Sequence, residues 1–251
     1  MPPAAESPAA PAGRPAANDY DSFAEAYSAE NEVNLANAYY ERPATLALAG
    51  DVAGRRILDV GCGSGPLFAA LRDHGAIVTG FDASAGMLKL ARLRLGDDAD
   101  LHLADLGHPL PFPDAAFDDV IASLVLHYLE DWTAPLAELR RVLKPGGRLI
   151  MSVMHPIHGL SLVRPGADYF ATHQWSEENT TSAGQSYVLT YWHRPLPAMT
   201  SAFTAAGFRI AVISEPPPAA DTPRELLPEA LAAKPAGSAF LCFLFFVLEA
   251  P

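Results

Sequence analysis

The nine residues 57–65, ILDVGCGSG, decide the fold. Apolar strand-forming residues and one acid, Asp59, are followed by three glycines, Gly61, Gly63 and Gly65. Glycines permit a tight turn and let a ligand lie against bare main chain, and a helix that follows such a turn offers unpaired N–H groups. We therefore expect a cofactor-binding loop. Glycine-rich turns also serve nicotinamide and flavin cofactors or are purely structural, so the neighbouring residues must decide.

Composition limits the class of protein. The chain has 251 residues, 50% of them hydrophobic, and a formal net charge of −12. This length suits one α/β domain. The negative charge would repel a phosphate backbone, so we expect a small-molecule substrate and no nucleic acid. Cys62 and Cys242 lack disulfide or metal spacing, which fits a reducing compartment. A monomer and a homodimer remain equally open.

Both ends of the chain have a biased composition. Residues 1–18 are rich in proline and alanine, contain Glu6 and lack a continuous apolar run, so we expect a disordered tail and not a signal peptide. The apolar run at 239–250, AFLCFLFFVLEA, is too short to cross a bilayer as a helix. Its Phe and Val content favours a buried strand. We expect a cytoplasmic protein with no membrane association.

Between residues 57 and 153 the chain alternates strand-like and helix-like segments. Strands are expected at 55–60, 76–82, 100–106, 117–124 and 148–153, and helices at 65–75, 84–96 and 132–143, with a KPGG turn at 144–147. Alternating units of this kind form a doubly wound parallel sheet, in which ligands bind at the carboxyl ends of the strands. The glycine loop ends the first strand, and Asp82 ends the next one, where a carboxylate can accept both hydroxyls of a ribose.

Five motifs, in order, resemble those of the class I S-adenosylmethionine (SAM) dependent methyltransferases, specifically small-molecule enzymes of the methyltransferase type 11 kind. They are LDVGCGSG, GFDAS, HLADL, FDDVIASLVLHYL and VLKPGGRLIMSV. The nicotinamide pattern G-x-G-x-x-G is not met, because position 66 is Pro66. The resemblance implies a Rossmann-like, doubly wound, seven-stranded α/β sheet, mostly parallel with a final antiparallel strand and helices on both faces. It also implies a single domain, 19–251, with SAM as its cofactor.

The resemblance also implies a set of cofactor-binding residues. The glycines would contact the methionine part and ribose of SAM, Asp82 the ribose hydroxyls, and Arg42 the carboxylate. Core packing for Met87, a loop cap for Asp105 and a solvated side chain for Arg42 remain alternatives. The full set is Tyr27, Arg42, Asp59, Gly61, Cys62, Gly63, Gly65, Asp82, Ala83, Met87, Asp105, Leu106, Ser123 and Leu124.

Two segments outside the motifs are expected to cover the site. Residues 19–50 resemble the family's amphipathic N-terminal segment and are expected to form a helical lid. Residues 154–195 are too long for an ordinary connection, and two aromatic-rich flanks predict a hairpin that walls an apolar substrate pocket. The residues expected to bind substrate are Tyr20, His158, Tyr169, Trp175 and Tyr191. Simple packing of the N-terminal helix is the alternative for Tyr20.

Chemistry is expected to rest mainly on positioning, because transfer of a methyl group from a sulfonium needs little acid or base assistance. Candidate general bases are His155, directly after the fifth strand, and His127, after the fourth. For both histidines a structural role is an open alternative. No spacing predicts a metal site. A non-methylating SAM enzyme, such as a cyclase or a 3-amino-3-carboxypropyl transferase, and a non-catalytic SAM-binding module are the competing functions.

Overall fold

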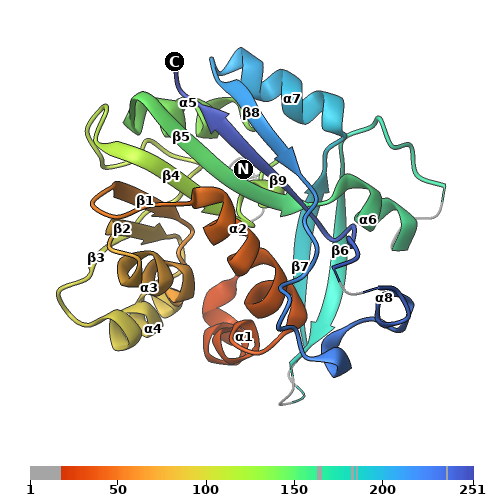
Figure 1. The fold of residues 1–251 in the computed structure, drawn as a ribbon. Helices are drawn as coiled ribbons and strands as arrows, with labels where there is room; N and C mark the ends of the chain where they lie inside the picture. Colours follow the sequence, from red (N-terminus) through yellow and green to blue (C-terminus); the bar gives the residue numbers. More distant parts are fainter. Residues whose placement is uncertain (1–17, 163–165, 182–183, 185, 236) are drawn as a thin grey trace, which may run out of the picture.

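A seven-stranded sheet forms the centre of the computed structural model, which describes residues 18–162, 166–181, 184, 186–235 and 237–251. The strand order is β3-β2-β1-β4-β5-β9-β8, and β9 is antiparallel to both of its neighbours, whereas β1 to β5 pair in parallel (Figure 1). The strands are β1 (Arg56–Val60), β2 (Ile77–Asp82), β3 (Asp100–Leu103), β4 (Phe117–Ser123), β5 (Leu143–Met154), β8 (Arg209–Ser214) and β9 (Phe243–Glu249). The doubly wound fold and the final antiparallel strand are confirmed.

Helices cover both faces of the sheet because successive strand residues point to opposite sides. In β1, Ile57 packs with α3 (Pro66–Asp73) and α4 (Ala85–Leu95), whereas Leu58 packs with α5 (Thr133–Val142) and α7 (Leu196–Ala205). In β4, Ile121 belongs to the same cluster as Ile57, and Val120 belongs to the same cluster as Leu58. Each face thus has its own apolar cluster, and the expected helices on both faces are confirmed.

The KPGG segment differs from the expected turn. It belongs to β5, which begins at Leu143 and pairs with β4 across an irregularity in register between Phe117 and Asp119. Gly147 allows this close approach, because a Cβ atom there would lie 2.9 Å from the carbonyl oxygen of Asp118. Extended pairing with a bulge therefore replaces the turn.

A buried carboxylate joins the three central strands near their amino ends. Asp119 is fully buried and accepts hydrogen bonds from Arg148 through Nε at 2.8 Å and Nη2 at 2.9 Å. Arg55 also binds it through both Nε and Nη2. Burial raises the pKa of Asp119, but the hydrogen bonds from the two arginines outweigh it and hold the pKa below its usual value. This network fixes β1, β4 and β5 relative to one another.

The N-terminal segment and the insertion after β5 lie together beside the sheet. The expected hairpin is present as β6 (His173–Thr180) paired with β7 (Ser186–His193), and α6 (Pro156–Leu162) precedes it (Figure 1). The N-terminal elements are a 3₁₀ turn (Tyr20–Phe23), α1 (Ala24–Asn31), a π-helical turn (Leu35–Glu41) and α2 (Arg42–Ala49). After β8 come a 3₁₀ turn (Arg224–Leu226) and α8 (Glu229–Ala232). Residues 1–17 of the expected tail lie outside the described part of the chain.

Candidate active site

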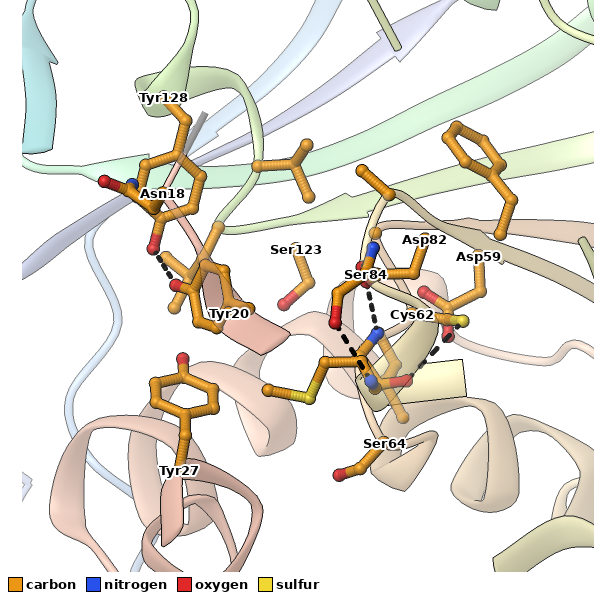
Figure 2. Close-up of a pocket in the computed structure, with 18 of the residues that line it drawn as sticks. Asn18, Tyr20, Tyr27, Asp59, Cys62, Ser64, Asp82, Ser84, Ser123 and Tyr128 are labelled. Carbon is orange, nitrogen blue, oxygen red and sulfur yellow. Dashed lines mark hydrogen bonds between the residues drawn. The ribbon is translucent and has the colours of Figure 1, made fainter. Parts of the chain in front are cut away.

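A cavity of about 510 Å³ lies at the carboxyl ends of β1, β2 and β4, under the N-terminal segment. Its size is that of a site for a cofactor-sized ligand. Figure 2 shows Tyr20, Tyr27 and Tyr128 on one side and Asp59, Asp82 and Ser84 on the other, with Ser123 between them. The expected binding residues that line this cavity are Tyr20, Tyr27, Arg42, Asp59, Gly61, Cys62, Gly63, Asp82, Ala83, Met87, Asp105, Leu106, Ser123 and Leu124.

The glycine loop presents bare main chain to the cavity. Gly61 has φ +64°, and a Cβ atom there would lie 2.6 Å from Val125. Gly63 has φ +55°, and nothing lies within 4 Å of its Cβ position, which faces open space. The two glycines therefore serve different purposes: Gly61 lets the loop after β4 approach, and Gly63 leaves room for a ligand.

Gly65 has a structural role, and its contact with the cofactor stays a prediction. It precedes α3 with φ +82°, and a Cβ atom there would lie 2.8 Å from Leu95 and 3.5 Å from Ala91 of α4. It does not belong to the described cavity lining. The third glycine of the motif thus permits α3 and α4 to pack closely.

Asp82 is the polar centre of the cofactor side. One carboxylate oxygen accepts the N–H of Gly63 and the other accepts the N–H of Ser84, each at 2.8 Å. Burial raises the pKa of Asp82, and the backbone hydrogen bonds oppose this effect. A carboxylate has about four acceptor positions, so two further donors can bind. The geometry suits a ribose diol, and it also ties the end of β2 to the glycine loop.

Two further acids form the floor of the cavity, and sequence reasoning found only one of them. Asp59 is buried, and its Oδ2 has no hydrogen-bond partner within the described residues. Burial raises its pKa well above the usual value, and the neighbouring Glu41 and Asp82 raise it further. Glu41, which was not expected in the site, is also buried and accepts hydrogen bonds from Thr45 and Ser152 at 2.7 Å. These oxygens suit a ligand that carries donors or positive charge.

Arg42 lines the cavity but is also engaged within the protein. Its Nη2 donates to the backbone and side-chain oxygens of Asn31 at 2.9 and 2.8 Å, and its Nη1 lies 3.8 Å from Glu32. The side chain is 18% exposed, so a fully solvated arginine is wrong. Burial lowers its pKa, and Glu32 acts in the opposite direction. Contact with a SAM carboxylate remains a prediction.

Two expected adenine contacts combine structural and cavity-lining roles. Met87 is buried in α4, and its N–H is capped by the hydroxyl of Ser84 at 3.0 Å. Asp105 accepts the N–H of Gly107 at 2.8 Å, which is the loop cap considered as its alternative. Both side chains nevertheless line the cavity, as does Leu106. Packing and ligand contact are therefore compatible at these positions.

The side opposite Asp82 is a wall of tyrosines. Tyr20 and Tyr27 come from the N-terminal segment, as expected, and Tyr128 comes from the 3₁₀ turn after β4 (Leu126–Tyr128). The hydroxyls of Tyr20 and Tyr128 lie 2.5 Å apart. Sequence reasoning missed Tyr128, although its place directly after the fourth strand was a usable signal. Burial raises the pKa of all three phenols, that of Tyr27 to about 12.

Two of the expected substrate residues of the insertion, Trp175 and Tyr191, lie behind this wall. Trp175 stacks on Tyr191 at 4.7 Å, and Tyr191 stacks on Tyr128 at 5.4 Å. The hydroxyl of Tyr169 accepts a hydrogen bond from the N–H of Leu196, and His158 belongs to α6. These four expected substrate residues, Tyr169, Trp175, Tyr191 and His158, are not part of the described cavity lining. The hairpin supports the wall instead of forming it.

Neither candidate base is placed to act as one. Nδ1 of His155 accepts the N–H of Ile157 at 3.1 Å, so Nε2 carries the proton and donates to Glu215 at 2.9 Å. Nδ1 of His127 accepts the N–H of Met154 at 3.0 Å, and burial lowers the pKa of His127 to about 3. Neither residue lines the described cavity. For both histidines the structural alternative fits the geometry, and a catalytic role stays a prediction.

Within the described part of the chain, no group of three or more His, Cys, Asp or Glu side chains could hold a metal ion. The same residues contain no helix that is long and apolar enough to span a membrane.

Comparison with known proteins agrees with this geometry. Residues 58–151 match the family model described as "Methyltransferase domain". A demethylmenaquinone methyltransferase of Clavibacter sepedonicus is 39% identical over 153 residues, which are 60% of this chain and 62% of the relative. A malonyl-[acyl-carrier protein] O-methyltransferase of Serratia marcescens is 39% identical over 109 residues, 43% of this chain and 42% of that protein. This chain thus spans less than two thirds of the length of these relatives.

A solved structure gives more complete coverage. The S-adenosylmethionine dependent methyltransferase of Mesorhizobium loti is 28% identical, with a TM-score of 0.62, over 82% of this chain and 96% of that one. The chain is therefore similar to the class I SAM-dependent methyltransferases, in sequence over residues 58–151 and in fold over most of its length, and this similarity supports SAM as the cofactor. The open Gly63 cradle, the spare acceptor positions of Asp82 and the buried acids of the cavity floor fit that group.

Proposed function

We propose that this protein transfers the methyl group of SAM to a small, partly apolar acceptor. The observation that carries the proposal is a single cavity whose one side has the polar groups that suit SAM and whose other side is a tyrosine wall. A protein that only bound SAM would not need a second, partly apolar side facing the cofactor. The names of the relatives, which include demethylmenaquinone methyltransferases, support an acceptor of metabolite size.

The chain's contribution is to orient two reactants within one cavity. Bound SAM would supply a methyl group on a positively charged sulfur, which would leave as a neutral thioether, and a proton released by the acceptor would pass to the solvent. Asp82 and the main chain at Gly63 hold the cofactor side, and Ser123 and Leu124 lie between the two sides. Alignment of this kind can account for a large part of a rate enhancement.

A dedicated histidine base is not part of this proposal. The described cavity lining contains no histidine or lysine. The three tyrosines stay protonated because burial raises their pKa values. The acceptor is therefore one that reacts without a histidine or lysine base, such as an amine, a thiol, a carbon nucleophile or an acidic hydroxyl. The carboxyl groups that line the cavity are the protein groups left to accept its proton.

The test is a product analysis with SAM and a panel of such acceptors, followed by mass spectrometry. We expect S-adenosylhomocysteine together with a methylated acceptor. The acceptor should be heavier by about 14 mass units, because replacing a hydrogen atom by a methyl group adds one CH₂. Methylthioadenosine would instead indicate transfer of the 3-amino-3-carboxypropyl group. Tight SAM binding without turnover of any acceptor would support the non-catalytic alternative.

A further inference from the structure

We propose that the paired hydroxyls of Tyr20 and Tyr128 recognise the acceptor, and that the acceptor is an uncharged, ring-sized molecule with a hydroxyl or amino group. This inference rests on the proposed function and names the acceptor class for the same cavity. It also assigns a role in specificity to Tyr128.

The pair is a recognition element because it brings two phenol oxygens together at the cavity wall. In the described structure the two hydroxyls hydrogen bond to each other at 2.5 Å, and both side chains line the cavity. One hydroxyl donates this bond, and further side-chain hydrogen bonds join Tyr20 to Tyr27 and Tyr128 to Tyr191. The pair is therefore the part of a chain of phenols that lines the cavity, and its oxygens keep lone pairs for a donor on the acceptor. An acceptor with one hydroxyl or amino group can donate to such a pair.

The pair is also held rigidly, which a specificity element requires. Tyr128 is stacked on Tyr191, and His127 packs edge-on against it at 4.4 Å. Tyr20 packs edge-on against Tyr27 at 5.0 Å. Rings that are packed in this way lose little conformational entropy when a ligand binds. Their hydroxyls therefore already have the orientation that binding requires.

The attachment of the N-terminal segment adds to this rigidity. Asn18 makes two hydrogen bonds to the backbone of Thr190 in β7, at 2.8 and 3.1 Å. Phe23 stacks on Tyr187 of the same strand at 4.4 Å. The hairpin therefore fixes the N-terminal segment that carries Tyr20, and the same hairpin packs against Tyr128 through Tyr191.

Charge excludes acidic acceptors. Six carboxyl groups line the cavity, whereas its one lining cation in the described structure, Arg42, is already bonded to Asn31 and lies near Glu32. An anionic acceptor would be repelled by the lining carboxyl groups and, among the described residues, would find no lining cation that is free to pair with it. The neutral phenols add hydrogen bonding without charge. The lining acids are Asp19, Asp21, Glu41, Asp59, Asp82 and Asp105.

The test uses three probes of similar shape: toluene, p-cresol and 4-methylbenzoate. Their affinities are measured by ligand-observed NMR titration on the full chain saturated with S-adenosylhomocysteine. We expect p-cresol to bind at least roughly fivefold more tightly than toluene, the effect of one net hydrogen bond, and 4-methylbenzoate to bind most weakly. Equal affinities, no binding by any probe, or tightest binding by 4-methylbenzoate would each overturn the inference.

Three single substitutions locate the effect. Tyr128→Phe and Tyr20→Phe should each reduce the preference for p-cresol over toluene to within about twofold, with S-adenosylhomocysteine affinity unchanged. Tyr40→Phe is the matched control, because its buried hydroxyl donates to the carbonyl of Phe240 outside the cavity, and it should keep the preference. A preference that survives in both cavity variants overturns the inference alone. Failure of the wild type to bind S-adenosylhomocysteine would overturn the proposed function as well.

Discussion

Replacement of Asp82 by alanine should weaken SAM binding by roughly 2–4 kcal/mol, which is about 30-fold to 1000-fold in Kd. The magnitude follows from two losses. The carboxylate now accepts the N–H groups of Gly63 and Ser84, so its removal releases the glycine loop and leaves two donors unpaired. Its remaining acceptor positions are those available to the ribose hydroxyls. Asp82→Asn keeps the volume and one oxygen, so its effect should be intermediate, on the order of tenfold.

The assay is isothermal titration calorimetry with SAM, with thermal melting as a check on folding. Asp100→Ala is the matched control, since this carboxylate also belongs to a strand of the sheet and accepts a hydrogen bond from Thr79, but it does not line the described cavity. The control should bind SAM with wild-type affinity. A folded Asp82→Ala protein with unchanged SAM affinity would refute the assignment of this carboxylate to the cofactor.

Four other substitutions, at three residues, test the remaining assignments. Asp119→Ala should cost about 3–5 kcal/mol in denaturant unfolding, because two guanidinium groups lose their buried partner. Asp119 has a lowered pKa, so its stabilisation is complete above about pH 4 and is lost as pH falls through that pKa; Asp119→Asn should remove this acid-range slope. Burial lowers the pKa of His127 to about 3, so between pH 7.5 and 5 the wild type should lose about 2 kcal/mol of stability, and His127→Gln should flatten this dependence. His155→Gln should lower the melting temperature but leave turnover of the folded fraction within about twofold and the pH profile intact; a 100-fold loss of turnover would restore the base assignment.

The cofactor side of the site could be predicted from sequence because its residues follow directly from strand positions. Parallel strands end at one edge of the sheet, so a motif that follows a strand is placed by the topology alone. Gly63, Asp82 and Ser123 are of this kind, and each lines the cavity. Gly65 shows the limit of the method: its place in the motif is the same, but the side chain of Leu95, distant in sequence, occupies the space beside it.

The acceptor side could be predicted only in part, since aromatic residues there form two layers. Composition predicts an aromatic hairpin that walls the pocket; the hairpin is present, but its residues do not belong to the described cavity lining. The sequence pattern does not determine whether the ring of Tyr191 contacts a ligand or the ring of Tyr128. A buried aromatic ring gives the same pattern in both cases. Glu41 was missed for a related reason: a buried acid beside Arg42 has the sequence pattern of an exposed helical charge pair.

The hydrogen bonds of the two histidines favour a structural role for both residues. A neutral imidazole whose Nδ1 accepts a backbone N–H has no free basic nitrogen, and this holds for His127 at Met154 and for His155 at Ile157. His127 joins the turn after β4 to the end of β5, and His155 joins that end to Glu215, which follows β8. Tyr128 is adjacent to the first of these contacts. Because Tyr128 directly follows His127, the hydrogen bond between His127 and Met154 helps to fix the position of the tyrosine wall.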